Sequence, residues 1–201
     1  MEKTESARMV DLKETIIIDD VIPETLQEEY HDKILSSRGW CFIKDMSYSK
    51  GELKYPSYGF NMLFKHPDHG VVSPLYETIC VPLINSLLEK TKLEINDIYF
   101  NRSFLQLPLS QSFYKGNNGL HVDLPDPHYA CVYYLNDSDG DTIIMEQSID
   151  DTPPGSKDVD VRIHKTVTPK KGRMVVFDGK RYHCSSQPTE NYRAIINFDL
   201  I

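Results

Sequence analysis

The chain has 201 residues, with 22 lysines and arginines against 30 aspartates and glutamates and a formal net charge of −8. A chain of this length suits one domain that buries most of a substantial core. The acidic balance and the lack of a basic run argue against a nucleic-acid partner, because proteins that bind DNA or RNA carry a cationic surface.

The sequence gives no signal for export or membrane insertion. No stretch reaches about 18 successive apolar residues, and no apolar run follows residues 1–5. We therefore expect a cytoplasmic protein without a membrane partner. The four cysteines (Cys41, Cys80, Cys131 and Cys184) lack paired, metal-type spacing, so free thiols are expected. The sequence leaves the oligomeric state open.

The first part of the chain predicts a helix between short strands. Residues 16–18 are three isoleucines, a β-branched run typical of a strand. Pro23 suits the first position of a helix that we expect to end at Gly39, and residues 40–43 predict the next strand. Residues 46–61 are rich in tyrosine and glycine and predict a long loop, either a substrate lid or a surface loop with packed tyrosines.

A second helix is expected after Ser73, which suits a helix cap, with Pro74 at its first position. Leucines and isoleucines recur at helical spacing as far as Leu88. Pro82 lies inside this segment and predicts a kink, because proline cannot donate a helical hydrogen bond.

From Tyr99 onward, apolar and polar residues alternate with a period of two. Frequent turns between short strands predict a mainly β fold with flanking helices, in a sandwich or jelly-roll barrel. We expect one domain over residues 1–201, in which 1–98 supply helical support and edge strands and 99–201 form the β core. The expected strands of this core are 99–107, 119–123, 130–135, 142–146, 159–167, 173–177, 183–185 and 193–200.

His121 and Asp123 form a His-x-Asp pair within the predicted strand 119–123. Side chains two apart on a strand point from the same face, so both could reach one metal ion. The best candidate for a third ligand is His183, which Arg193 follows ten residues later. Two histidines and one carboxylate on one side of a metal form the facial triad of non-haem Fe(II) oxygenases, which leaves other coordination positions open.

Two other histidines compete with this set, and a third histidine follows the His-x-Asp pair in the sequence. His66 begins a second His-x-Asp sequence, but the proline inside it does not suit a paired strand, and its surroundings indicate an exposed turn. His164 is the more serious rival, because Arg173 follows it by nine residues and because the apolar face of its strand could pack outward. His128 follows the motif closely and could contact the substrate, although a position on a loop surface is expected.

Arg193 begins a predicted strand whose other face is apolar, with Ala194, Ile196, Phe198 and Leu200. A buried arginine needs an anionic partner. Two alternatives remain open here: a salt bridge to a carboxylate of the protein across the barrel, or a bound acid.

The ordered set of His121, Asp123, His183 and Arg193 resembles the motif of the 2-oxoglutarate and Fe(II)-dependent dioxygenases, in particular their prolyl hydroxylase-like branch. The similarity covers about residues 105–200 and includes three flanking segments: Phe113-Tyr114-Lys115-Gly116-Asn117, Val132-Tyr133-Tyr134-Leu135-Asn136, and Pro169-Lys170-Lys171-Gly172-Arg173-Met174-Val175-Val176-Phe177. The resemblance implies a double-stranded β-helix with the N-terminal helices packed on one sheet.

By position, the resemblance implies that the two histidines and Asp123 bind Fe(II), and that Arg193 binds the distal carboxylate of 2-oxoglutarate. Tyr114 and Tyr134 are implied as hydrogen-bond donors to this co-substrate, although tyrosines of a barrel also serve as core packing. One departure is Ile195, which stands where many relatives have serine or threonine.

The implied activity is hydroxylation of an unactivated C–H bond, with O2 consumed, 2-oxoglutarate converted to succinate and CO2, and ascorbate as a supporting reductant. The implied substrate is a peptidyl proline, a free amino acid or another small molecule. Two alternatives of other classes remain: a barrel that binds a ligand or partner without turnover, and a zinc hydrolase that uses the same His, Asp and His.

Overall fold

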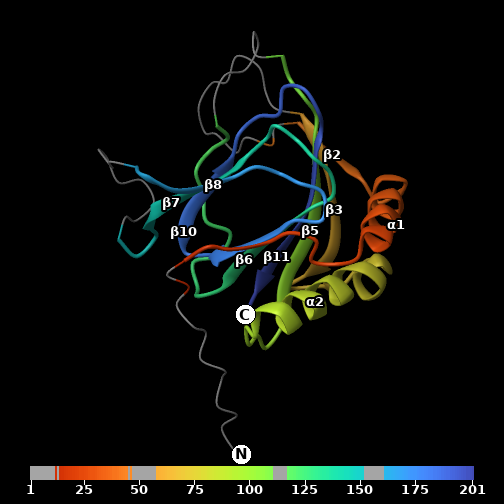
Figure 1. Cartoon of the computed structure of the whole chain (residues 1–201), viewed down its shortest axis with the longest axis horizontal. Coiled ribbons are helices and arrows are strands. Elements are labelled where there is room, and N and C mark those ends of the chain that lie inside the picture. Colours follow the sequence, from red (N-terminus) through yellow and green to blue (C-terminus); the bar gives the residue numbers. More distant parts are fainter. Residues whose placement is uncertain (1–11, 13, 45, 47–57, 111–116, 152–160) are drawn as a thin grey trace, which may run out of the picture.

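The computed structural model describes residues 12, 14–44, 46, 58–110, 117–151 and 161–201. Within them, two antiparallel sheets face each other, and helices cover the outer face of the larger sheet (Figure 1). The helices are α1 (Glu24–Leu35) and α2 (Val81–Thr91), the latter preceded by the π-helical turn η1 (Tyr76–Cys80). The strands are β1 (Ile16–Ile18), β2 (Cys41–Ile43), β3 (Gly59–His66), β4 (Gly70–Val71), β5 (Ile98–Gln106), β6 (Tyr129–Tyr134), β7 (Thr142–Ser148), β8 (Ile163–Val167), β9 (Met174–Asp178), β10 (Arg181–Ser185) and β11 (Arg193–Leu200).

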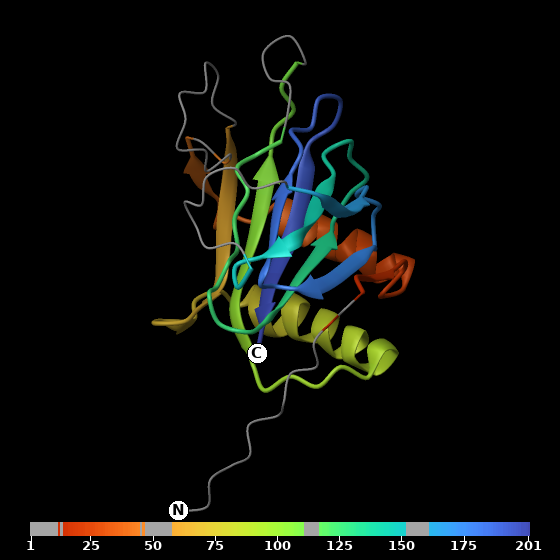
Figure 2. The same cartoon turned by 90° about the vertical axis from the view of Figure 1, so that its left-hand side faces the viewer.

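The two sheets differ in size. The larger has the strand order β1-β9-β6-β11-β5-β3-β2, with β4 paired to β3, and the smaller has the order β10-β7-β8. Figure 2 shows the strands lying in front of the helices, which pack behind the larger sheet. This is the mainly β, jelly-roll arrangement with helices on one sheet that the sequence predicts. The four cysteines are free thiols, as the sequence also predicts.

The closing strand β11 separates two layers of apolar packing. Its alternate residues Ala194, Ile196, Phe198 and Leu200 pack into the core between the larger sheet and the helices. Ile195 points to the opposite side and packs into a second cluster between the two sheets. Because each fully buried large apolar side chain contributes about 1.5–3 kcal/mol, the outer core anchors β11 and fixes which residues of the strand face the space between the sheets.

The C-terminal end of α1 differs from the prediction. The helix begins after Pro23 as expected, but it ends at Leu35 and not at Gly39. The indole Nε1 of Trp40 donates to the carbonyl of Ile34 at 3.0 Å. The same carbonyl accepts the N–H of Ser37 at 3.2 Å, so two donors stabilise the end of the helix here, before the glycine.

Pro82 changes the type of helix. It lies in the first turn of α2, directly after the π-helical turn η1. The wider π turn accommodates a residue that lacks an N–H and whose ring clashes with the preceding turn. The predicted kinked helix is therefore a π-helical turn followed by an α-helix. Neither described helix has the length and apolar character needed to span a bilayer.

Strand β3 was not predicted, because its first residues fall in the expected loop 46–61. A Cβ added to Gly59 would come within 2.6 Å of the carbonyl oxygen of Leu105 and even closer to the Met46 side chain. The glycine therefore permits close packing of β3 on β5 and does not mark a turn. Residues 47–57 lie outside the described part of the chain, so the lid interpretation of this loop stays a prediction.

The expected strand 119–123 is wrong. Of these residues, only His121 makes a β-bridge, a single antiparallel one to His183. Pro125 and Pro127 follow closely, and proline cannot donate to a strand ladder. The other predicted strands are present, with ends shifted by a few residues.

Candidate metal centre

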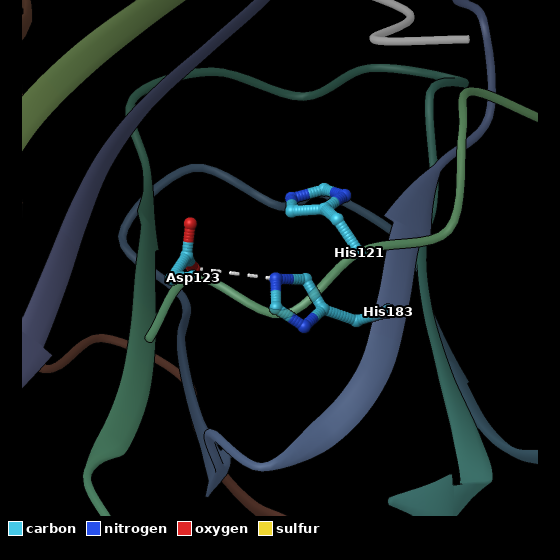
Figure 3. Close-up of side chains that lie close together, drawn as sticks. All are labelled: His121, Asp123 and His183. Atoms are coloured by element: carbon cyan, nitrogen blue, oxygen red, sulfur yellow. Dashed lines mark ion pairs between the residues drawn. The ribbon is translucent and has the colours of Figure 1, made fainter. Parts of the chain in front are cut away.

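Three side chains from two distant parts of the sequence meet between the sheets. His121, Asp123 and His183 each offer one ligand atom, and these atoms all lie within 4.8 Å of one another. Figure 3 shows the two imidazoles and the carboxylate directed toward a common space. The structure thus brings together the three residues that the sequence analysis singled out.

The backbone sets the positions of the two imidazoles. The N–H of His121 donates to the carbonyl of His183 at 3.0 Å, and the N–H of His183 donates to the carbonyl of His121 at 2.9 Å. Their ring centroids lie 4.6 Å apart. Asp123 follows in a bend of the chain, and its Oδ2 lies 3.3 Å from Nε2 of His183. A single bridged pair and a bend of the chain, and not a regular strand, therefore bring these side chains together.

Backbone carbonyls orient both imidazoles. Nδ1 of His121 lies 2.9 Å from the carbonyl oxygen of Gly119, and Nδ1 of His183 lies 3.1 Å from that of Arg181. Because a carbonyl only accepts hydrogen bonds, each Nδ1 carries a proton, and in the neutral ring Nε2 keeps its lone pair. Such bonds to the second ring nitrogen are typical of histidines that bind metals.

Burial and charged neighbours set the protonation of Asp123 and His121. Burial alone would raise the pKa of Asp123, but the hydrogen bond from His183 and the charge of Arg102 hold it well below its usual range. Burial and the nearby His183 lower the pKa of His121 to about 4. At neutral pH, Asp123 is therefore ionised and His121 is neutral, which are the forms that bind a metal ion.

Arg193 is buried in the same region, with 5% of its surface exposed. Its Nε donates to the carbonyl of Gly140 and its Nη2 to Oγ1 of Thr142, both at 2.8 Å. The hydroxyl of Tyr134 also donates to Thr142 Oγ1, at 2.7 Å, and burial lowers the pKa of Arg193. Among the residues that the structure describes, Arg193 forms no ion pair with a carboxylate. Within this part of the chain, the first alternative for its partner, a salt bridge across the barrel, is therefore excluded.

A cavity of about 330 Å³ connects these groups. It is lined by the three residues of the cluster, by Arg193 and by apolar side chains that include Phe104, Val132 and Ile195. Its size suits a small ligand, and a mainly apolar lining with a few converging polar groups is typical of ligand sites.

The rival histidines lie elsewhere. His66 is at the turn between β3 and β4, where its ring stacks on His69 with centroids 4.8 Å apart. His164 lies in β8 and is not part of the cluster. Arg173, which made His164 a serious rival, donates from Nε to Asp19 Oδ1 at 2.6 Å near the surface. Neither rival contributes to the site.

The expectation for His128 is wrong. It is 1% exposed and not on a loop surface. Its Nδ1 lies 2.8 Å from the carbonyl oxygen of Asp126, and its Nε2 lies 4.0 Å from Oδ1 of Asp199. Its position directly before β6 carries it into the interior, which the polar and proline-rich sequence ahead of it conceals.

The predicted hydrogen bonds of the two tyrosines to the co-substrate stay predictions. Tyr134 is fully buried, and its hydroxyl lies in the hydrogen-bond network of Arg193 through Thr142. Tyr114 lies outside the described residues, so its role stays a prediction. Ile195, where the chain departs from the motif that it resembles, lines the cavity.

Sequence reasoning missed two residues of the site. Arg102 in β5 donates from Nη2 to Oδ1 of Asp123, and Thr142 links Arg193 to Tyr134. Arg102 had a detectable signal, since it is a cation two residues from both Phe100 and Phe104 in a predicted strand. Thr142 had none, because threonine is common in strands for packing reasons alone.

Comparisons with protein-family models and with curated protein sequences give no match. Solved structures share the fold. The non-haem alpha-ketoglutarate-dependent epimerase SnoN from nogalamycin biosynthesis is 12% identical, with a TM-score of 0.64 over 93% of this chain and 78% of that one. A prolyl hydroxylase from Trichoplax adhaerens, in complex with a hypoxia-inducible factor peptide, is 14% identical, with a TM-score of 0.55 over 92% and 83%.

The viral collagen prolyl hydroxylase of Paramecium bursaria Chlorella virus-1, solved with 2-oxoglutarate, is also 14% identical, with a TM-score of 0.54 over 92% of this chain and 94% of that one. These likenesses span almost the whole chain at low identity, so they concern the fold. The chain therefore has the fold of the 2-oxoglutarate and Fe(II)-dependent oxygenases, prolyl hydroxylases included, and within that fold His121, Asp123 and His183 converge.

Proposed function

We propose that the protein is a 2-oxoglutarate- and Fe(II)-dependent dioxygenase that hydroxylates an unactivated C–H bond. The observation that carries the proposal is the convergence of His121, Asp123 and His183 in one cavity with the buried Arg193. Neither feature alone is specific, because small groups of titratable residues and buried arginines occur in many proteins. Together they supply a metal site and a carboxylate site within one small volume.

The three ligand residues fit Fe(II). Two imidazole nitrogens and one carboxylate oxygen form the facial set that this ion accepts, and they leave the opposite positions open for ligands. The metal and the 2-oxo acid supply the activation of O2 when they are bound. The carbonyls of Gly119 and Arg181 hold the imidazoles in the required tautomer.

Arg193 fits the distal carboxylate of 2-oxoglutarate. Its guanidinium is held by Gly140 and Thr142, and a rigid fork of N–H donors matches a carboxylate better than a lysine ammonium does. Tyr134 would stabilise this arrangement through Thr142. A buried cation without a protein carboxylate gains most from a ligand that carries one.

The proposed reaction consumes one O2 and one 2-oxoglutarate for each substrate. One oxygen atom enters the substrate C–H bond to form an alcohol, the other enters succinate, and the 2-oxo acid loses CO2. Ascorbate serves as a supporting reductant. The chain's own contribution is to hold the co-substrate, to orient the metal ligands and to keep the cavity mainly apolar.

Two substrate classes are open for this site. One structural neighbour is a prolyl hydroxylase with a peptide, and another is an epimerase of a biosynthetic route. By this analogy, we propose a peptidyl proline or a free amino acid as the substrate class, with another small molecule as the next choice.

The proposal is tested by incubation of the protein with Fe(II), ascorbate, O2 and 2-oxoglutarate labelled at its first carboxylate. We expect slow release of labelled CO2 without substrate, which is lost in Asp123→Ala and falls strongly in Arg193→Ala. Arg162→Ala is a matched control, because this arginine pairs with Glu146 at the surface. Bound metal without CO2 release would favour a non-catalytic barrel, and hydrolysis supported by Zn(II) would favour the hydrolase.

A further inference from the structure

Arg102 is a second cation on the wall of the same cavity. It lies in β5, opposite Asn197 of the neighbouring strand β11, whereas Arg193 pairs with Gln106 of β5. Arg102 and Gln106 are four residues apart on β5, which corresponds to about 13 Å along a strand. The cavity therefore has an arginine toward each end, and the His–Asp–His cluster lies with Arg102 because Asp123 bonds to it.

Aromatic side chains hold the Arg102 guanidinium in place. Its central carbon lies 4.3 Å from the ring centroid of Phe100 and 5.3 Å from that of Phe104. A guanidinium stacked on rings keeps its charge and its planar fork while it loses rotational freedom. The side chain is 18% exposed. It is thus pre-organised, and little further entropy would be lost when it bound a ligand.

The hydrogen bonds of Arg102 are incomplete. A guanidinium offers five N–H donors. Among the residues that the structure describes, the one acceptor of Arg102 is Oδ1 of Asp123, which bonds to Nη2. Its Nε is buried without a hydrogen-bond partner in the same described part of the chain. Buried polar groups are normally paired, so this arginine has donor capacity that the described residues do not use.

The net charge of the cavity lining also favours the binding of an anion. Its described lining contains two arginines and a single carboxylate, that of Asp123. The two arginines and Asp123 together carry one net positive charge. The two imidazoles are neutral, and the charges of a divalent metal ion and of the dianion 2-oxoglutarate cancel, so one net positive charge would remain in the loaded site. In a small apolar cavity such a charge is poorly solvated. A substrate that carries one negative charge would neutralise it.

We propose that Arg102 is a specificity-determining residue that binds a carboxylate of the primary substrate. This inference rests on the proposed function and narrows it. A free amino acid or another small carboxylic acid has such a group close to its C–H bonds, whereas a residue inside a peptide has an amide there. The site therefore selects a small carboxylate over an internal peptide residue.

The test uses propionate and propionamide, which have closely similar shapes and differ in charge. The full chain is loaded with Mn(II) and saturating 2-oxoglutarate, so that Arg193 is occupied and no turnover occurs. Broadening of the probe's proton resonances by the paramagnetic ion then reports binding in the cavity. We expect propionate to bind about 10- to 100-fold more tightly than propionamide, the ratio that corresponds to a lost hydrogen bond to a charged group.

Arg102→Ala should remove this preference and Arg102→Lys should restore part of it, while Arg162→Ala should leave it unchanged. In each variant the affinities for Mn(II) and for 2-oxoglutarate are measured separately. Equal binding of the two probes by the unmodified chain would overturn the inference. An Arg102→Ala variant that keeps the preference for propionate would also overturn it. The same holds for a variant whose only loss is in affinity for the metal or for 2-oxoglutarate, because Arg102 would then merely position Asp123 or serve the co-substrate.

A second readout follows turnover. Free amino acids should stimulate release of CO2 from 2-oxoglutarate more than the corresponding N-acetyl amides, and the difference should vanish in Arg102→Ala. Greater stimulation by the amides would contradict the inference. If the unmodified chain bound neither metal nor 2-oxoglutarate, the proposed function itself would fail, and this result is distinguishable from a loaded protein without a preference for carboxylates.

Discussion

His121 and His183 exchange a pair of backbone hydrogen bonds, of 3.0 and 2.9 Å, in an isolated antiparallel bridge. Together with the hydrogen bond from the N–H of Asn118 to the carbonyl of Ser185, this bridge joins the segment that carries Asp123 to the strand β10 of the smaller sheet. It means that the cluster is positioned by main-chain atoms, which remain when a side chain is replaced. Substitutions of the cluster residues should therefore change metal binding more than they change the fold.

The first prediction concerns the two histidines that competed for the role of third ligand. His183→Ala should weaken Fe(II) or Mn(II) binding at least about 100-fold, because it removes a metal ligand and not merely a group that orients one. His164→Ala is the matched control, since His164 lies in β8 outside the cluster. Titration calorimetry measures both variants, and a larger loss in His164→Ala would show that the ligand set is wrong.

The second prediction concerns Arg193. Arg193→Ala should raise the KM for 2-oxoglutarate by about 30-fold or more, the effect of truncating one partner of a buried charged pair. Arg193→Lys should fall between this variant and the unmodified chain, because an ammonium lacks the planar fork. Steady-state kinetics at varied 2-oxoglutarate, with metal content checked, tests this. An unchanged KM in both variants would place the co-substrate carboxylate elsewhere.

The third prediction separates Thr142 from Tyr134. Thr142 Oγ1 accepts hydrogen bonds from both Arg193 and Tyr134, so Thr142→Val leaves two buried donors without an acceptor. We expect about a 10-fold rise in the KM for 2-oxoglutarate, and a rise of only about 3-fold for Tyr134→Phe, which removes one donor and leaves Arg193 bonded. The order of the two effects is the diagnostic result, and the reverse order would mean that Tyr134 contacts the co-substrate directly.

The fourth prediction concerns pH. Burial alone would lower the pKa of His183, but the hydrogen bond to Asp123 raises it above 6.5. A raised histidine pKa gives stability that is fully present below the unfolded value and is lost as the pH rises through the folded value. Burial and the charge of Asp123 raise the pKa of Asp199 from the ordinary value of 3.8 to about 8. The raised pKa of Asp199 therefore also reduces the stability of the folded protein as the pH rises between these two values.

The metal-free protein should therefore lose thermal stability between about pH 6.5 and about pH 8. Metal affinity should rise over the same range, because metal competes with the proton on His183. Thermal unfolding with and without Mn(II), across this range, tests both trends. Asp199→Asn should flatten the metal-free profile, and a metal-free Tm that increases with pH would contradict the assigned ion pair.

The sequence predicted the cluster through residue order rather than through correct local structure. His121 and Asp123 were expected to share the face of a strand, yet a single bridge and a bend bring them together. The inference succeeded because a short spacing limits how far apart two side chains can lie. Alternation in β11 likewise predicted which residues face the helices, since a period of two survives in any strand with one apolar side.

Other features depend on long-range packing that local patterns do not encode. Asp123 contacts both Arg102 of β5 and Asn197 of β11, which lie opposite each other in the paired strands. The register of that pairing cannot be predicted from either strand alone. Gly59 indicates a turn by composition, but the structure uses it for close packing on Leu105. His128 is preceded by prolines and aspartates and is nevertheless buried.

The most direct test of the central claim is an anaerobic crystal structure of the protein with Fe(II) and 2-oxoglutarate, with anomalous data at the iron edge. We predict one iron peak bonded to Nε2 of His121, a carboxylate oxygen of Asp123 and Nε2 of His183, with 2-oxoglutarate extending from it to the guanidinium of Arg193. Iron bound away from these three residues, or a co-substrate that does not reach Arg193, would contradict the account.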